Sequence, residues 1–432
     1  MSALRLRLAA ATVAVATFLG GCSLAGGSAS TAAVTATAAD DVLDETKVHT
    51  ISLDVDETTL REMIQTYLDS GDKEWIKAAV TIDGETFTDV GIKLKGNSSL
   101  RNITVDTPAA ELPLRIRLDK YVDDQDVDGI ADFTVRSTSS ETAMNEAVAL
   151  DLLEDAGLAS EPSIATRFSV NGGDTELRLT VQNLDDTWVE QNFPDAGADS
   201  VLYKSDADGD WSWRGADGDY TTSFGVEAGE ENYAPLIKLL DLVNNGTAAE
   251  IAEQLPTMLD VDPLATYLAF EELIDNFDDI DGPGNNSYLF YDSATKKFTV
   301  VAWDHNLAFG TSNVGGGGNR GGGQGGGGQR PEGAPSAAPG GGGAPGGGGQ
   351  RDGGGGGRMS KENPLSTAFL ANAEWKALYE KAATDLEASL IDDGTLTESV
   401  DRWSQLLTTG ASDLVTTEAI TSEADKIRAY AS

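Results

Sequence analysis

Apolar residues recur along the chain with two different periods, and together these predict a mixture of helices and strands. Helical spacing is found at 58–70, 141–156, 234–255 and 263–275, with a connection into a helix at 183–193 and at least two more helices in 362–432. Strand patterns are found at 78–82, 87–94, 164–170, 176–181, 287–291 and 298–302. This order predicts a sheet carrying one long helix, followed by a more helical half.

Polar side chains flank the last pair of predicted strands, 287–291 and 298–302. Asp278 and Asn286 lie in the loop before the first strand, and Asp304 directly follows the second. A hairpin brings these oxygen donors to one end, where hard cations such as Mg²⁺ bind with phosphate oxygens completing the shell. Protein kinases hold a metal-nucleotide with a similar order of residues. The sequence therefore predicts a metal-nucleotide site at this end of the hairpin.

The motifs around this hairpin resemble those of the spore coat protein H (CotH) kinase family. They read Asn276-Phe277-Asp278, then Asn286-Ser287-Tyr288-Leu289-Phe290-Tyr291, then Trp303-Asp304-His305-Asn306. Upstream, similar family elements are found at 91–99 (GIKLKGNSS), 114–121 (LRIRLDKY) and 145–149 (NEAVA). The resemblance covers about residues 48–432 in the same order. It implies an α+β, atypical protein-kinase-like fold of two lobes with extra C-terminal helices.

The resemblance also implies roles for the residues of the hairpin and its loop. Asp278 stands where the family has its catalytic base or orienter of the acceptor hydroxyl. Counting back five residues from Asn286, as in ordinary kinases, gives Asp281 instead, and both alternatives stay open. Asn286 and Asp304 are the expected ligands of Mg²⁺ or Mn²⁺. Asn306 replaces an aspartate that the family often has, so this turn lacks a second carboxylate.

The expected ATP-binding residues lie in the first half of the chain. A loop with backbone N–H groups and hydroxyls can cradle phosphate oxygens, and a cation paired with a helix carboxylate completes a kinase phosphate site. Glu146 fits as that carboxylate, while the choice of its cation stays open. The candidate set comprises Lys95, Gly96, Asn97, Ser98, Arg115, Arg117 and Glu146. Strand alternation places Arg115 and Arg117 on the same face.

The first residues carry the pattern of a bacterial lipoprotein signal peptide. Residues 1–22 contain two arginines, an apolar run too short to span a bilayer, and small residues before Cys22. Cys22 is the expected lipidation site and the only cysteine, so no internal disulfide can form. Residues 23–46 are expected to be a flexible tether. The predicted location is the outer face of the cytoplasmic membrane, with a lipid anchor as the membrane contact.

The net charge and a low-complexity segment give information on partners and on domain boundaries. The net charge of −41 argues against nucleic acid as a partner. Residues 312–360 are dominated by glycine and are expected to be a disordered insert. It divides a kinase-like domain into 47–311 and a C-terminal helical part, 361–432.

The expected activity is metal-dependent transfer of the ATP γ-phosphoryl group to Ser or Thr of a cell-surface protein or of the chain itself. One alternative is a non-catalytic surface adhesion or cell-wall interaction module on the same scaffold, because a fold does not fix a function. Another is a nucleotidyl transferase that uses the same metal site.

Overall fold

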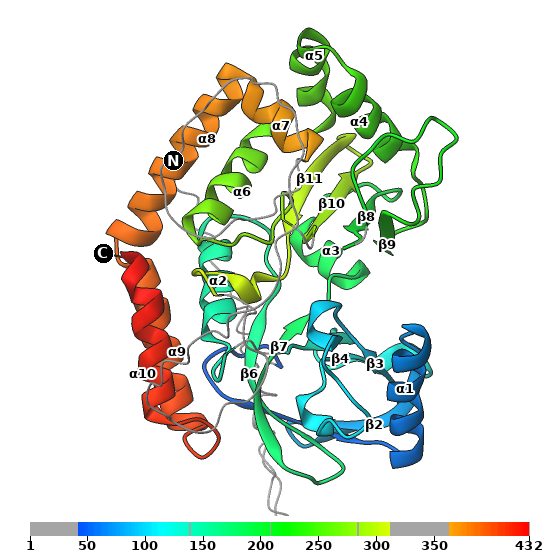
Figure 1. Ribbon diagram of the computed structural model, residues 1–432, viewed down its shortest axis with the longest axis vertical. Coiled ribbons are helices and arrows are strands. Elements are labelled where there is room, and N and C mark those ends of the chain that lie inside the picture. Colours follow the sequence, from blue (N-terminus) through cyan, green and yellow to red (C-terminus); the bar gives the residue numbers. More distant parts are fainter. Residues whose placement is uncertain (1–41, 138–139, 208, 283–284, 312–362, 432) are drawn as a thin grey trace, which may run out of the picture. The chain divides into compact units, whose positions relative to one another are not determined.

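Seven strands in the first half of the chain close into a barrel (Figure 1). They are β1 (His49–Asp54), β2 (Ile76–Ile82), β3 (Glu85–Leu94), β4 (Leu114–Arg117), β5 (Asp132–Val135), β6 (Ser163–Val170) and β7 (Thr175–Gln182). The order around the barrel is β1-β2-β3-β4-β5-β7-β6, and parallel pairing of β1 with β6 closes it. The sequence predicted a sheet in this region but not its closure.

Alternation of side chains separates the apolar interior of the barrel from a polar outer face on β3, β4 and β5. Ile92, Ile116 and Phe133 belong to the apolar cluster of the barrel. Lys93 pairs with Arg115, and Arg115 with Thr134, so basic and polar residues occupy the opposite face. This outer face provides one wall of the candidate site described below.

Two helices cover the barrel. Helix α1 (Glu57–Ser70) begins at Asp56, whose side chain accepts a hydrogen bond from the Thr59 amide, and ends at Gly71 in the left-handed conformation. Helix α2 (Met144–Asp155) shares an apolar cluster with residues of β6 and β7. It is the long helix that the sequence predicted for 141–156.

The second sheet has four strands in the order β11-β10-β8-β9. Its strands are β8 (Val201–Ser205), β9 (Phe224–Ala228), β10 (Ser287–Asp292) and β11 (Lys297–Ala302). Strands β10 and β11 pair from Ser287 with Ala302 to Asp292 with Lys297, which confirms the predicted hairpin. One face, with Tyr288 and Trp303, shares an apolar cluster with α3 (Asp186–Asn192).

The opposite face of this sheet packs on helices, because Leu289 and Val300 belong to the large helical core. The helices after β9 are α4 (Ala234–Asn245), α5 (Ala248–Met258), α6 (Val261–Leu273), α7 (Pro364–Ala371), α8 (Ala373–Leu386), α9 (Thr395–Gly410) and α10 (Thr417–Arg428). The α+β class and the additional C-terminal helices agree with the sequence prediction.

The computed structural model describes residues 42–137, 140–207, 209–282, 285–311 and 363–431. These lie in one compact unit, Asp41–Ser432. The predicted signal peptide with Cys22, most of the tether and the glycine-rich insert lie outside the described residues. Within them, no helix combines the length and apolar character needed to cross a membrane.

Candidate active site

A buried arginine that directly follows β5 joins two of the predicted site residues. The guanidinium of Arg136 lies 2.6 Å from Glu146 Oε1 on α2 and also forms an ion pair with Asp304. Both carboxylates favour the charged guanidinium and raise the pKa of Arg136, although burial opposes this. These three residues are called the Arg136 cluster. Glu146 is 2% exposed but Asp304 is 27% exposed, so Asp304 is the member open to a ligand.

The turn after β11 places Asp304 against α2. Asp304 adopts the left-handed conformation, with φ 67°, which aspartate tolerates better than most residues. The next residues form a short 3₁₀ turn, His305–Leu307. Asn145, the neighbour of Glu146, donates its side-chain amide to the Asn306 carbonyl at 2.7 Å. Helix α2 and the Asp304 turn are thus tied together by a hydrogen bond, besides the ion pairs that both form with Arg136.

A buried polar chain connects the same turn to the loop that carries Asp278. His305 Nε2 lies 3.2 Å from Glu271 Oε1 on α6, and Asn276 Nδ2 donates to Glu271 Oε2 at 2.8 Å. Burial opposes protonation of His305, but Glu271 outweighs it and raises the pKa of the imidazole. Since Asn276 opens the Asn276-Phe277-Asp278 motif, Glu271 holds the two motif loops in register.

The two candidate catalytic aspartates have different surroundings. Asp281 Oδ1 accepts hydrogen bonds from Ser366 Oγ at 2.6 Å and from the Asn363 amide at 3.3 Å. It therefore fastens the start of α7 to the loop. Asp278 is half-buried, and a Cβ at Gly282 would lie 2.4 Å from its Cα, so this tight loop requires glycine at 282. Burial raises the pKa of Asp281, although the hydrogen bond from Ser366 acts to lower it.

Two adjacent asparagines before β10 have different surroundings. The buried Asn285 accepts a hydrogen bond from Trp211 Nε1 at 2.9 Å and donates to the Asp206 carbonyl at 3.0 Å. Its φ of 53° is one that asparagine tolerates. The side chain of Asn286 is half-buried and has no hydrogen-bond partner among the described residues. Asn286 therefore keeps its carboxamide oxygen available to a ligand.

Cations gather around Trp303, the residue before Asp304. Lys95 Nζ, Lys204 Nζ and Arg136 Cζ lie 5.3, 5.2 and 5.4 Å from the centre of its ring. Among the described residues, neither lysine has a carboxylate within ion-pair distance, although the chain carries 71 acidic residues. Burial, and next to it the charge of Lys204, lowers the pKa of Lys95 well below its usual range. Such an arrangement favours an anionic ligand.

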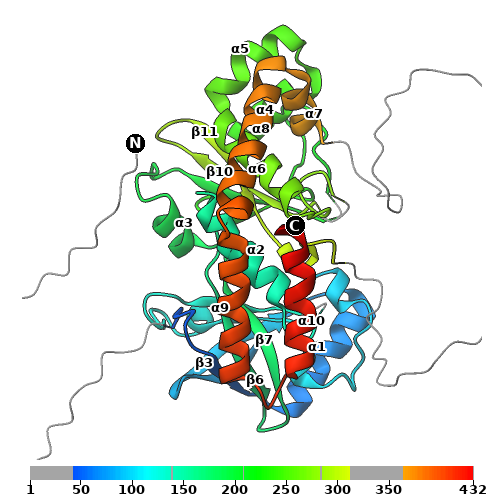
Figure 2. The same ribbon diagram turned by 90° about the vertical axis from the view of Figure 1, so that its left-hand side faces the viewer.

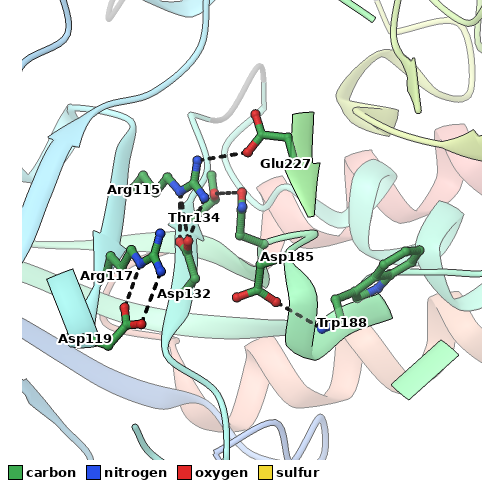
Figure 3. Close-up of polar contacts among 9 residues, drawn as sticks. Arg115, Arg117, Asp119, Asp132, Thr134, Asp185, Trp188 and Glu227 are labelled. Atoms are coloured by element: carbon green, nitrogen blue, oxygen red, sulfur yellow. Dashed lines mark hydrogen bonds and ion pairs between the residues drawn. The ribbon is translucent and has the colours of Figure 1, made fainter. Parts of the chain in front are cut away.

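A second arginine on the barrel wall also joins two carboxylates (Figure 3). Arg115 Nη2 lies 2.7 Å from Asp132 Oδ2 on the adjacent β5, and Arg115 Nη1 lies 3.3 Å from Glu227 Oε2 on β9. These residues are called the Arg115 cluster. Its contact with Glu227 connects the barrel to the four-stranded sheet. Arg117 is bound separately by Asp119 at 2.6 Å.

The Gly96 loop lies beyond the end of β3. Gly96 has φ 102°, and a Cβ there would lie 2.0 Å from Ser99 Oγ, so the turn requires glycine. Its carbonyl accepts a hydrogen bond from Lys73 at 2.5 Å. Asn97 and Ser98 are exposed, and Ser98 begins a short 3₁₀ turn. Lys95 is the residue of this loop that reaches the Trp303 ring.

The donors around Asp304 fit a metal whose shell includes ligand oxygens. Within the described residues, no three His, Cys, Asp or Glu side chains form a metal-binding group. Mg²⁺, however, is commonly held by one or two carboxylates together with phosphate oxygens. Two buried donors without a partner, Arg136 Nε and Tyr288 Oη, also suit phosphate oxygens. Tyr288 stacks edge-on against Trp303, at 5.4 Å between ring centres.

Sequence reasoning missed two cations of this site, Arg136 and Lys204. It considered Lys95, Arg115 and Arg117 as partners of Glu146, and the structure gives Glu146 a different partner, Arg136. One available signal was position, because Arg136 directly follows β5, the last strand before α2. Lys204 carries no such signal, since β8 reaches Trp303 only through the order of the second sheet.

Comparison with known proteins agrees with these motifs. Residues 92–425 match the family model described as CotH kinase protein, and this stretch includes all members of both arginine clusters. No curated protein matches the chain. Because the matched stretch covers well over half of the sequence, the chain belongs to the CotH kinase protein family.

Proposed function

We propose that this protein is an atypical protein kinase with a two-lobed kinase-like fold, which transfers the γ-phosphoryl group of ATP to Ser or Thr hydroxyls. The single observation that carries the proposal is the Arg136 cluster. Protein kinases pair a strand lysine with a helix glutamate next to a metal-binding aspartate. Arg136, Glu146 and Asp304 combine the same charges on a strand end, a helix and the end of a hairpin.

The cations of the site bind and neutralise the phosphates. Arg136 offers its unpaired Nε together with a planar fork of donors, which suits phosphate oxygens. Lys95 and Lys204 add basic groups next to the ring of Trp303. All three nitrogens of Arg115 are bonded to carboxylates and Arg117 is bound by Asp119, so the proposal gives both arginines secondary roles at the wall of the site. Gly96, Asn97 and Ser98 contribute backbone amides and hydroxyls from the adjoining loop.

Asn286 and Asp304 are the proposed ligands of Mg²⁺ or Mn²⁺. Asn286 has an available carboxamide oxygen, and Asp304 has the more exposed carboxylate of the Arg136 cluster. A cation held by these two residues would supply positive charge that offsets the charge developing on the phosphate oxygens. Asp278 is the proposed residue that accepts and orients the acceptor hydroxyl. Asp281 stays the alternative, and its carboxylate also fastens the start of α7 through Ser366 and Asn363.

Binding of the metal-nucleotide is tested by calorimetric titration of the chain from Asp41 onward with ATP, in Mg²⁺ and in a chelator. We expect saturable binding in Mg²⁺ and much weaker binding without it. Comparable weak heats under both conditions would overturn the metal-dependent site.

Transfer is tested with ATP labelled at the γ- or the α-phosphate, using wild type, Asp278→Asn and Asp281→Asn. We expect γ-label on protein, loss of transfer by about 10² to 10⁴ in Asp278→Asn, and a milder effect in Asp281→Asn. Label from the α-phosphate identifies a nucleotidyl transferase. Absence of both labels, over a range of acceptors and metals, favours a non-catalytic adhesion module.

The proposed acceptors are surface proteins or the chain itself, because the proposal includes a lipid anchor at Cys22. Lipid chains attached to a cysteine hold a protein at a bilayer, whereas a signal peptide that has been cleaved off cannot. Cys22→Ala is expected to move the protein from the detergent phase to the medium or to leave an uncleaved precursor. Mature Cys22→Ala protein that stays in the detergent phase would contradict the anchor.

A further inference from the structure

The C-terminal helices α9 and α10 lie beside each other and against α2 (Figure 2). We call this pair, with the short turn Ala429–Ala431 that follows it, the C-terminal hairpin. Trp403 and Leu407 of α9 share an apolar cluster with Leu152 and Leu153 of α2. The hairpin is thus packed on the helix that carries Glu146.

A glutamate of the hairpin holds the start of α2. The carboxylate of Glu423, on α10, accepts hydrogen bonds from the amides of Glu141 at 2.9 Å and Thr142 at 3.2 Å, and from the Thr142 hydroxyl. Thr142 Oγ1 in turn accepts from the amide of Met144, the first residue of α2, at 3.1 Å. Glu423 therefore acts on the helix through Thr142, which lies four residues before the helix-borne Glu146.

The turn that Glu423 holds is strained. Ala143 is buried and has φ 54°. This left-handed conformation is energetically unfavourable for a residue that has a Cβ atom. No side chain caps α2 at this position. Strained conformations of this kind persist when surrounding contacts over-determine them. The charge-assisted bonds from Glu423 are contacts of that type, and they come from the C-terminal hairpin.

A tyrosine of the hairpin touches both motif loops. Tyr430 Oη donates to Asp275 Oδ2 at 3.2 Å, and its ring stacks edge-on against Phe309 at 5.4 Å. Asp275 precedes Asn276 and Asp278, while Phe309 follows the Asp304 turn. The Phe309 amide also bonds to the Ile274 carbonyl at 2.6 Å, so Tyr430 lies where the two loops meet. This residue lies beyond the matched stretch 92–425.

A third contact fixes the hairpin to the middle of α2. Asp151 of α2 accepts a hydrogen bond from Trp403 Nε1 at 2.9 Å and also bonds to Ser399 and Arg402, all on α9. Asp151 is 9% exposed, so these bonds are largely shielded from water. Helix α2 is therefore held at its start by α10 and along its length by α9.

We infer that the C-terminal hairpin positions the catalytic elements in cis, with Glu423 as a positioning residue for Glu146 and Tyr430 for the loops of Asp278 and Asp304. The inference rests on the proposed kinase function. Glu423 and Tyr430 touch neither substrate nor metal. They act through α2 and the two loops, and they set the geometry in which Arg136 meets Glu146 and Asp304.

The test compares Glu423→Ala and Glu423→Gln with wild type in steady-state transfer. Loss of the carboxylate frees the Thr142 turn, so Glu423→Ala is expected to raise the KM for ATP and lower kcat, with a combined loss in kcat/KM of about tenfold or more. Glu423→Gln keeps an acceptor oxygen and is expected to retain part of the kcat/KM that Glu423→Ala loses. A role in folding alone predicts no such graded kinetic effect in protein that remains folded.

Two variants control for charge and for hairpin stability. Glu418→Ala removes an exposed carboxylate from the same helix and matches the charge change. Asp413→Asn breaks the 2.6 Å ion pair between the hairpin and Arg167 of the barrel, a contact away from α2. Both are expected to keep wild-type kcat and KM. An Asp413→Asn variant that loses as much activity as Glu423→Ala would show that any loosening of the hairpin suffices, and would overturn the assignment to Glu423.

Amide hydrogen exchange gives a readout that does not depend on activity. Glu423→Ala is expected to speed exchange at 144–148, and Tyr430→Phe to speed it around 275–278, while Asp413→Asn changes neither. Unchanged exchange at 144–148 in Glu423→Ala would overturn the inference. A wild-type protein without any transfer overturns the proposed function instead, and the exchange data still decide whether Glu423 holds α2.

Discussion

The Arg115 and Arg136 clusters have the same composition but different surroundings. Each contains an arginine from the outer face or end of a barrel strand, a carboxylate that is almost completely buried, and a second carboxylate from the second sheet or the turn after it. Asp132, the buried partner of Arg115, lies on the neighbouring strand, while Glu146 lies on a helix held by other elements. The buried carboxylate of Arg115 therefore belongs to the same sheet as the arginine, whereas that of Arg136 belongs to a helix packed outside the sheet.

The partners of the two arginines also differ in their availability. In the Arg115 cluster the guanidinium makes four hydrogen bonds to its two carboxylates. In the Arg136 cluster the Nε has no partner, and lysines without ion pairs lie nearby. An arginine whose donors are all bonded fits a structural role, and one with an unpaired donor in a basic environment fits the proposed role in binding a ligand. Composition alone therefore does not identify the functional cluster.

The largest expected difference is in catalysis. Arg136→Gln removes the cation assigned to the phosphates, and kcat/KM is expected to fall by about 10³, the size of effect that an arginine finger has in phosphoryl transfer. Arg115→Gln is expected to reduce kcat/KM by less than about tenfold. The measurement is label transfer from γ-labelled ATP by folded protein. Equal losses in the two variants would remove the distinction between the clusters.

The next difference is in metal dependence. Asp304→Asn removes a ligand charge, so it is expected to abolish the Mg²⁺-dependent part of ATP binding while the fold remains intact. Asp132→Asn makes the matched change in the Arg115 cluster and is expected to leave that binding in place. Calorimetric titrations in Mg²⁺ and in a chelator compare the two. Wild-type affinity in Asp304→Asn would refute the metal assignment.

Stability is expected to show the reverse order. Asp132 is 1% exposed, so Asp132→Asn leaves Arg115 without its full partner and is expected to lower the free energy of unfolding by about 3 kcal/mol. Asp304 is 27% exposed, and Asp304→Asn is expected to cost less than about 1 kcal/mol. Urea unfolding of both variants measures this. A larger loss for Asp304→Asn would mean that the Arg136 cluster is the structural one.

The smallest expected difference concerns pH. Burial raises the pKa of Glu161, near Arg136, from 4.5 to about 8, and that of Asp185, near Arg115, from 3.8 to about 6. A carboxyl group whose pKa is higher in the folded than in the unfolded protein binds its proton more tightly in the folded state. Its contribution to stability is complete below the unfolded-state pKa and is lost as the pH rises through the folded-state pKa. Glu161→Gln is therefore expected to flatten the fall in stability between pH 4.5 and about 8.

Asp185→Asn is expected to flatten the same curve only between pH 3.8 and about 6. The midpoint of urea unfolding, measured across this range, separates the two windows. Identical pH profiles for both variants and wild type would show that neither carboxyl group holds its proton in the folded state.

The sequence predicted the elements of the site better than its connections. The β10–β11 hairpin was predicted almost to the residue, because alternation and turn composition are local signals. Arg136 was missed, since its partners lie 10 and 168 positions away and nothing in the adjacent residues marks the pairing. The choice between Asp278 and Asp281 also depended on a distant contact. Asp281 binds the start of α7, which lies 85 positions away at Ser366.

Closure of the barrel was unpredictable for the same reason. Helices and hairpins follow from neighbouring residues, but the parallel pairing of β1 with β6 joins segments separated by more than one hundred residues. The motif for a parallel pair is no different from that for any buried strand.

The closed barrel has a consequence for the order in which the molecule folds. Strand β1 must wait for β6, whereas β2–β3 and β6–β7 are hairpins that form from adjacent residues. The entropy of closing so long a loop makes the β1–β6 pairing a late and slow step. Until then, β1 presents an unpaired edge to other chains. The rate of barrel closure, and not the rate of helix formation, is thus expected to set how long the nascent protein is vulnerable to aggregation.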